Sequence, residues 1–256
     1  MNRPKFFDIH SHPNFADFDN DRDEVVKRAL DNSVWLAVVG TDKESSAQAV
    51  KLAEKYEKGV YAIIGQHPTT DGEFDYDFYK KLAGNPKVVA IGECGLDYFR
   101  DANKKQEEIF RKQIELANEM GKPLMLHIRN GKNVSAYRLA AEILKEKAKV
   151  VFNSHFFAGN LEEARLLLDL GATFSFTGVL TFTHDYDEII RYLPLEKIMA
   201  ETDCPFVTPA PYRGKRNEPI YVIEVAKKIA EIRNENFEKV REQLLQNSLQ
   251  FFNLKI

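Results

Sequence analysis

Histidine and acidic side chains in this sequence stand where they can do metal chemistry. Five of its six histidines lie at or near the ends of short apolar runs, and two carboxylates, Glu93 and Asp203, occupy equivalent places in two further runs. An unpaired charge in such a run would be costly, so the pattern favours a site over simple packing. Imidazole and carboxylate together suit Zn, Mn, Fe or Ni, and a carboxylate can bridge two ions. The sequence therefore predicts two divalent metal ions held by six residues: His10, His12, Glu93, His127, His155 and Asp203.

The spacing of these residues favours shared coordination. In His10-Ser11-His12 the two imidazoles are separated by one residue, so on a strand both point to the same face. Glu93, in a middle run, would bridge to a second ion that the histidines of the next two runs bind. Asp203 lies in the last run, which neighbours the first in a closed barrel and can complete the shell of the first ion.

Eight strand-like runs must position these residues. Successive runs begin 22 to 35 residues apart, which is the length of one strand, one helix and two short loops. Their near-continuous apolar character is typical of a parallel sheet that is buried on both faces. They predict an α/β fold, a single (β/α)8 TIM barrel over residues 1–256, since a doubly wound sheet usually has about five or six strands. The runs are Lys5–His12, Val34–Gly40, Val60–His67, Val88–Asp97, Pro123–Arg129, Val150–His155, Ala172–Val179 and Ile198–Pro205.

Helix signals lie between these runs. Thr41-Asp42-Lys43-Glu44 and Asn160-Leu161-Glu162-Glu163 are typical of capping boxes, in which two side chains satisfy amides of the first helical turn. Gly121 followed by Pro123 indicates a helix end. Two amphipathic helical faces are indicated by Phe110, Ile114, Ala117 and Met120, and by Ile223, Ala226, Ile229 and Ala230.

Composition excludes several classes of protein. The 36 basic and 39 acidic side chains leave a net charge of −3, which argues against an indiscriminate polyanion binder. With 29% charged and 11% aromatic residues, the chain is neither disordered nor fibrous. It has no apolar signal segment and no stretch typical of a membrane span, so we expect a cytoplasmic protein. Cys94 and Cys204 lie in apolar runs, where we expect reduced thiols that pack between strands and helices rather than bind metal.

Short motifs run in order from residue 8 to residue 219. They are Asp8-Ile9-His10-Ser11-His12, Gly65-Gln66-His67-Pro68, Ile91-Gly92-Glu93-Cys94-Gly95-Leu96-Asp97-Tyr98, Lys122-Pro123-Leu124-Met125-Leu126-His127-Ile128-Arg129, Ser154-His155-Phe156, Glu201-Thr202-Asp203-Cys204-Pro205 and Arg213-Gly214-Lys215-Arg216-Asn217-Glu218-Pro219. As a set they resemble the TatD family of metal-dependent deoxyribonucleases. The resemblance implies a TIM barrel of the amidohydrolase-like hydrolases, usually with two divalent ions, and ligand roles for the same six residues.

Two motifs depart from the usual family pattern. The family often has Ile-His-Ser-Arg followed by Asp or Glu and Ala, where this chain has Leu126-His127-Ile128-Arg129-Asn130-Gly131. Its usual His-Cys-Phe-Ser-Gly is here His155-Phe156-Phe157-Ala158-Gly159. No predicted ligand is lost. The changes alter neighbours of the second metal and the substrate contacts, so they bear on substrate range.

The resemblance implies hydrolysis of DNA phosphodiester bonds, which we expect to proceed from a 3′ end. Two ions (Mg, Mn, Zn, Fe or Ni), bridged by Glu93, would bind one water between them and lower its pKa, and Asp203 would accept the proton of that water. Arg129, two residues after His127 and on its face, is assigned to a phosphate oxygen, which a planar guanidinium fits well. His67 is either a substrate contact or a structural turn residue, and His184 is expected in a solvated loop near a helix start.

The loop from Pro205 to Pro219 is rich in proline and basic residues, which favours a functional role. Arg213 is predicted to bind the nucleic-acid backbone, with Lys215 and Arg216 beside it; a solvated basic turn is the alternative. Three aromatic residues near the same face would either stack on a terminal base or, more simply, pack in loops. These residues are Tyr98, Phe99 and Tyr212.

Two other functions fit the same residues. One is a metal-dependent hydrolase of carbonyl esters or amides, including the ester of an aminoacyl-tRNA, because the same water would attack a carbonyl. A glutamate at position 93, where many such relatives carry a carboxylated lysine, and nearby basic residues favour phosphate. The other is a non-catalytic metal-binding protein. The expected partner is a nucleic-acid substrate, DNA ends above all, with no membrane and no stable protein partner.

Overall fold

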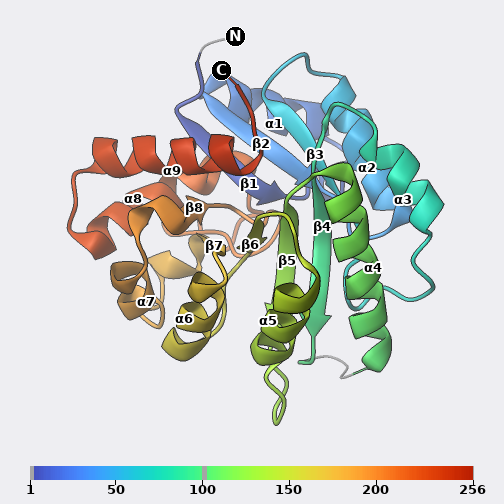
Figure 1. The fold of residues 1–256 in the computed structure, drawn as a ribbon. Coiled ribbons are helices and arrows are strands. Elements are labelled where there is room, and N and C mark those ends of the chain that lie inside the picture. Colours follow the sequence, from blue (N-terminus) through green and yellow to red (C-terminus); the bar gives the residue numbers. More distant parts are fainter. Residues whose placement is uncertain (1–2, 100–102, 256) are drawn as a thin grey trace.

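Eight parallel strands form one sheet whose spatial order is the order of the chain. The computed structural model describes residues 3–99 and 103–255. Helices surround the strands (Figure 1), and the predicted (β/α)8 TIM barrel is confirmed. The strands are β1 (Phe6–Ser11), β2 (Val34–Val39), β3 (Val60–Ile64), β4 (Val88–Asp97), β5 (Leu124–Arg129), β6 (Phe152–Ser154), β7 (Thr173–Phe176) and β8 (Ile198–Ala200).

Helices follow the strands in the expected alternation, with two after β8. The α-helices are α1 (Arg22–Asp31), α2 (Lys43–Glu54), α3 (Tyr76–Ala83), α4 (Lys104–Met120), α5 (Ala136–Lys147), α6 (Leu161–Asp169), α7 (Asp187–Tyr192), α8 (Val222–Arg233) and α9 (Phe237–Phe251). Short 3-10 helices are η1 (Ala16–Phe18), η2 (Gly178–Thr181), η3 (Leu195–Lys197) and η4 (Pro219–Tyr221). Each predicted run contains one strand, because a buried parallel strand is apolar on both faces.

The first and last strands meet at their carboxyl ends. The backbone N–H of Asp203 donates to the His10 carbonyl at 2.9 Å, and the N–H of His12 donates to the Cys204 carbonyl at 2.9 Å. These two bonds join the segment after β8 to β1. They also bring Asp203 beside the His10-Ser11-His12 segment, as a closed barrel requires.

The apolar core has two layers. One lies between the strands and the surrounding helices and includes Phe110 and Ile229 from the predicted helical faces. The other fills the inside of the barrel, where Ile9 and Trp35 of the strands meet apolar residues of α9. The ring of Phe7 in β1 lies 5.4 Å from that of Phe252, just after α9. Helix α9 therefore covers the barrel interior at the end opposite to the strand termini that carry the histidines.

Helix caps largely follow the sequence signals, with one correction. The capping box of α6 is formed by Asn160 and Glu163, as predicted. The box of α2 lies one residue later than predicted, because Asp42 rather than Thr41 is the N-cap and its carboxylate accepts from the Ser45 N–H. Ionised Asp42 is the stronger acceptor for that amide. Gly121 ends α4 in the left-handed conformation with φ 61°, as its position indicates.

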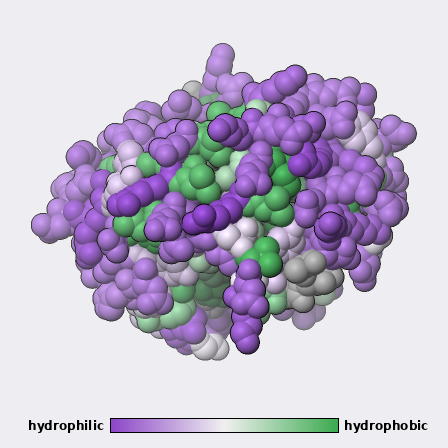
Figure 2. Space-filling model, turned by 60° about the horizontal axis from the view of Figure 1, so that its bottom comes forward, coloured by the Kyte–Doolittle hydropathy of each residue, from purple (hydrophilic) through white to green (hydrophobic). Residues whose placement is uncertain are grey.

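The face of the molecule in Figure 2 is mostly hydrophilic, with hydrophobic residues exposed in patches between hydrophilic ones. In the part of the chain that the structure describes, no helix combines the length and the apolar character of a membrane span.

Candidate metal centre

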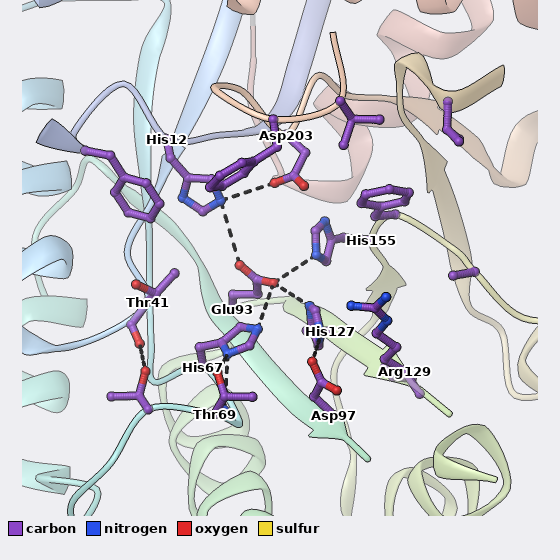
Figure 3. A pocket seen from close by; sticks show the side chains of 18 of the residues that line it. His12, Thr41, His67, Thr69, Glu93, Asp97, His127, Arg129, His155 and Asp203 are labelled. Atoms are coloured by element: carbon purple, nitrogen blue, oxygen red, sulfur yellow. Dashed lines mark hydrogen bonds and ion pairs between the residues drawn. The ribbon is translucent and has the colours of Figure 1, made fainter. Parts of the chain in front are cut away.

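The six predicted ligands converge at the carboxyl ends of the strands. Figure 3 shows five of them, His12, Glu93, His127, His155 and Asp203. His10 and His12 bring their Nε2 atoms to 3.2 Å from one another. Asp203 Oδ1 lies 3.3 Å from Nε2 of His12 and 3.8 Å from Nε2 of His10. These three side chains are all buried and form a first group of ligand atoms. They come from the carboxyl end of β1 and from the segment after β8, which backbone hydrogen bonds join.

Glu93 lies between this group and a second one. Its Oε2 atom is 3.3 Å from Nε2 of His10. Its Oε1 atom is 2.7 Å from Nδ1 of His127 and 2.9 Å from Nε2 of His155. The two oxygens of one carboxylate thus face the two groups, which is the geometry of a bridging ligand.

Irregular backbone places Glu93 in this position. The pairing of β4 with β5 shifts register between Ile91 and Cys94, and such irregularities at barrel rims re-aim side chains. Glycines flank the carboxylate: Gly92 has φ 154° and Gly95 has φ 139°. A Cβ at Gly92 would clash with the Met125 carbonyl oxygen, and one at Gly95 with that of His127. Both positions therefore require glycine, because β4 and β5 approach each other closely here.

Three of the four imidazoles are oriented by a partner on their outer nitrogen. Nδ1 of His12 lies 2.9 Å from the Val39 carbonyl, and so donates to it. Nε2 of His127 lies 3.1 Å from a carboxylate oxygen of Asp97, and Nδ1 of His155 lies 3.2 Å from one of Glu201. An outer N–H that donates leaves the inner nitrogen with a free lone pair, which is the form that binds a metal. His10 differs, because its buried Nδ1 has no hydrogen-bond partner among the described residues.

Glu201 is a buried carboxylate to which the sequence reasoning assigned no role. Besides His155, its Oε1 accepts from the Phe156 N–H at 2.6 Å, and its Oε2 accepts from the Ser175 hydroxyl at 2.6 Å. The side chain is inaccessible to solvent. The signal for both Glu201 and Asp97 was the one used for Glu93, an acid within a predicted apolar run.

The charges of the site compensate one another only in part. Burial alone would raise the pKa of the Glu93 carboxyl, but His155, His67 and His10 outweigh burial and hold this pKa well below its usual range. Burial is likewise opposed at His155, whose pKa is held well above its usual value by Glu93 and Glu201. Within residues 3–99 and 103–255, no Lys or Arg pairs with Glu93 or Asp203. Two buried carboxylates without a permanent cation fit a site for divalent ions.

The ligand groups open into a cavity of about 600 Å³. His67 and Arg129, two predicted substrate contacts, line it together with Thr41, Thr69 and Asp97. The guanidinium of Arg129 lies 4.0 Å from the centre of the exposed Phe99 ring. No carboxylate pairs with this guanidinium in the described parts of the chain. Arg129 therefore presents an uncompensated positive charge at the cavity wall.

His67 is both a turn residue and a cavity residue. The Thr69 N–H donates to Nδ1 of His67 at 3.2 Å, so Nε2 carries the proton of the neutral ring. Nε2 lies 3.5 Å from Oε1 of Glu93. Ligand atoms of His67, Asp97 and His127 also come within reach of one ion. That third group fits a metal poorly, because His67 Nε2 carries a proton and His127 already donates to Asp97.

Arg213 lies outside the cavity lining. Its guanidinium packs 4.0 Å from the Phe182 ring and donates to the Thr208 carbonyl at 2.9 Å. Arg216 forms a bidentate ion pair with Asp21, at 2.9 and 2.6 Å, so its charge is already compensated. The role predicted for Arg213 in nucleic-acid binding remains a prediction.

The remaining predicted residues mostly pack. Tyr98 is buried, and Tyr212 stacks on Tyr221 with ring centres 4.1 Å apart, so of the three aromatic candidates Phe99 alone is largely exposed. His184 is exposed and contacts Asp187 of α7, as expected near a helix start. Both thiols are buried in apolar clusters, as expected, and burial raises the pKa of each. The cavity side chains that the sequence did not single out include Phe15, Phe156, Phe206 and Val207, with Thr69, Thr70, Val179 and Tyr186 beside them.

Comparison with known proteins gives a consistent pattern. The family model described as TatD related DNase matches residues 7–253. An uncharacterized metal-dependent hydrolase of Bacillus subtilis, YabD, is 38% identical over 97% of this chain and 99% of its own length. A Pantoea ananatis protein named 3'-5' ssDNA/RNA exonuclease TatD is 33% identical over 97% of this chain and 99% of its own length. The crystal structure of YJJV, a TatD homologue from Escherichia coli, superposes with a TM-score of 0.88 at 28% identity, covering 98% of this chain and 99% of that one.

Proposed function

The chain belongs to the TatD family of metal-dependent hydrolases, and on that premise we propose that it is a deoxyribonuclease that removes nucleotides from the 3′ end of single-stranded DNA. One observation carries the proposal: the buried His and carboxylate groups open into a cavity whose wall holds Arg129, which pairs with no carboxylate in residues 3–99 and 103–255. Such a cation beside the site suits the charge of a phosphodiester. The name of the Pantoea ananatis relative agrees with this reaction.

We assign two divalent ions to the two groups of ligand atoms. His10, His12 and Asp203, whose ligand atoms lie close together, would hold one ion. His127 and His155, which both contact Oε1 of Glu93, would hold the other, and Glu93 would face both ions through its two oxygens. When bound, the ions lower the pKa of a water molecule and neutralise charge on the phosphoryl oxygens. Mixed imidazole and carboxylate ligands accept several metals, so the set is compatible with Mg, Mn, Zn, Fe or Ni.

Asp203 is the residue that we assign to accept the proton of the attacking water. It lines the cavity and retains slight exposure, 12% of its side chain, unlike the fully buried His10. Burial raises the pKa of the Asp203 carboxyl, but His12, His10 and His155 outweigh burial and lower it. The carboxylate is therefore ionised at neutral pH and able to take up a proton.

Arg129 and His67 would orient the substrate. The planar Arg129 guanidinium can donate two parallel hydrogen bonds to the non-bridging oxygens of one phosphate. His67 presents an Nε2–H toward the space beside Glu93, since its Nδ1 accepts from Thr69. A neutral donor at this place can bind an oxygen of the phosphate without competing for metal.

A substrate panel tests this proposal. Protein freed of metal and of contaminating nuclease is given Mg²⁺, Mn²⁺ or Zn²⁺ with a 5′-labelled single strand, or with p-nitrophenyl acetate as a carbonyl ester. We expect shortening of the strand from its 3′ end and little ester hydrolysis. Ester hydrolysis without any cleavage of the strand would instead place the chain among carbonyl hydrolases. The Glu93→Gln variant, purified in parallel, controls for contamination and should not cleave.

A further inference from the structure

One wall of the cavity is aromatic rather than polar. Phe15 follows β1, Phe156 follows β6, and Phe206 and Val207 follow β8, and all four line the cavity that holds the candidate ligands. We propose that this aromatic wall binds the unpaired base of a nucleotide next to the bond that is cut. The inference rests on the proposed nuclease function and names the part of the substrate that the site selects.

Two of these aromatic rings, Phe206 and Phe15, form a row from the surface to the candidate ligand His12. The Phe15 ring stacks on the imidazole of His12, with centres 4.4 Å apart and planes at 15°. The Phe206 ring meets Phe15 edge to face at 6.5 Å, and 52% of Phe206 is exposed. Phe15 is thus occupied by its neighbours, whereas Phe206 has a free face. A planar ring that enters the cavity would find its stacking partner in Phe206.

The backbone that carries the wall is held in place. The buried Asn217 amide donates to the Thr202 carbonyl at 2.9 Å and to the Phe206 carbonyl at 2.5 Å. The Phe156 N–H donates to Glu201, which in turn contacts His155. Glu201 therefore holds both a wall residue and a candidate ligand, although the rings of the wall reach solvent.

Two of the wall residues adopt a costly backbone conformation. Phe156 has φ 39° and Val207 has φ 52°, in the left-handed region that bulky and β-branched residues rarely adopt. Asp203, which also lines the cavity, has φ 53°. Such conformations cluster at active sites and ligand clamps, where the surrounding structure holds them. Their presence in three cavity residues favours a binding role for the wall over incidental packing.

A nucleotide has the shape and charge that this cavity matches. Its phosphate would lie between the ligand groups and Arg129, and its base would extend from there toward the aromatic wall. A base paired and stacked inside a duplex cannot enter such a cavity, so the bound base must be unpaired. Stacking on an aromatic side chain tolerates any base and changes affinity about 5- to 150-fold per base. The wall therefore selects single strands without selecting sequence.

A pair of matched strands tests the wall directly. One ends in thymine nucleotides at its last two positions, and the other in dihydrothymine, which keeps the polar atoms but loses the flat aromatic ring. We expect the wild type to cut the thymine strand with a kcat/KM about 5-fold or more higher. Phe206→Leu should abolish that preference and Phe206→Trp should retain it. The control Tyr192→Leu, an exposed aromatic on α7 outside the cavity, should behave as the wild type.

Equal cleavage of both strands by the wild type, or a preference retained by Phe206→Leu, would overturn the inference while leaving the nuclease proposal intact. A separate binding measurement tests the wall if the protein binds the strand without cleaving it. A single strand ending in 2-aminopurine should lose fluorescence on binding, through stacking, and Phe206→Leu should reduce that loss. Quenching without cleavage under any metal would support base binding by the aromatic wall and contradict the nuclease proposal. Absence of quenching in the wild type would contradict base binding by the wall.

Discussion

Substitution of Glu201 tests whether this carboxylate orients the candidate ligand His155. Its carboxylate accepts from His155 Nδ1, the Phe156 N–H and the Ser175 hydroxyl, at 3.2, 2.6 and 2.6 Å. Glu201→Gln keeps the shape and one acceptor oxygen, and the Ser175 hydroxyl can rotate to accept from the new amide. What disappears is the negative charge, and charge-assisted hydrogen bonds are roughly twice as strong as neutral ones.

The expected result is a loss of metal affinity with the fold retained. Removing a partner that orients a histidine ligand typically weakens metal binding about 10- to 100-fold, or about 1.4 to 2.7 kcal/mol. The assay is competition between the metal-free protein and a fluorescent zinc chelator at neutral pH. Thermal unfolding of the metal-free proteins shows whether the variant still folds.

Glu163→Gln is the matched control. Glu163 is also a buried glutamate, and it accepts hydrogen bonds from the Asn160 N–H, the Asn130 amide and the Ser135 hydroxyl. It lies outside the lining of the metal cavity. Wild-type zinc affinity in Glu201→Gln, or an equal loss in both variants, would refute the claim that Glu201 orients His155.

Three further predictions concern the reaction and its pH dependence. Asp203→Asn should lower kcat about 10²- to 10⁴-fold at saturating Mn²⁺, the usual contribution of a general base, while the melting temperature stays near that of the wild type; unchanged turnover would exclude Asp203 as the base. Arg129→Ala should lower kcat/KM for DNA about 10- to 100-fold, from the loss of charged hydrogen bonds to phosphate. Arg129→Lys should restore only part of this loss in kcat/KM, and a wild-type kcat/KM with lysine would argue against bidentate binding of the phosphate. In the metal-free protein, the raised pKa of His155 contributes stability that is fully present below the unfolded-state pKa of about 6.5 and is lost as the pH rises through the folded-state pKa. The melting temperature of the metal-free protein should therefore fall as the pH rises from about 6.5 through the folded-state pKa. Saturating Zn²⁺ should remove this fall, which a pH series of unfolding curves would check.

Much of the candidate site could be predicted because, in a barrel, the position of a residue along its strand determines where the residue lies in space. A histidine at the carboxyl end of a predicted strand must lie at the barrel mouth, so His10, His127 and His155 could be brought together without a structure. Glu93 followed from the same rule. These residues depend only on strand order and strand ends, and the apolar runs define both.

Other features depend on contacts that strand position does not determine. Glu201 orients His155 across two strands, and nothing in its own sequence neighbourhood indicates which imidazole it meets. Phe206 faces the cavity only because the loop after β8 is held by Asn217, eleven residues later. The loop residue Arg216, which the sequence placed beside a nucleic-acid contact, instead pairs with Asp21 of the loop before α1. No local sequence pattern predicts this contact.

The proposed reaction requires two divalent ions per chain. Metal-free protein is titrated with Mn²⁺ while bound metal and cleavage of a 3′-labelled single strand are followed in the same samples. Cleavage should stay low through the first equivalent and rise with the second, and His127→Ala should retain one equivalent without activity. Full activity at one equivalent, or no cleavage at any loading with any of the five metals, would contradict the two-ion assignment.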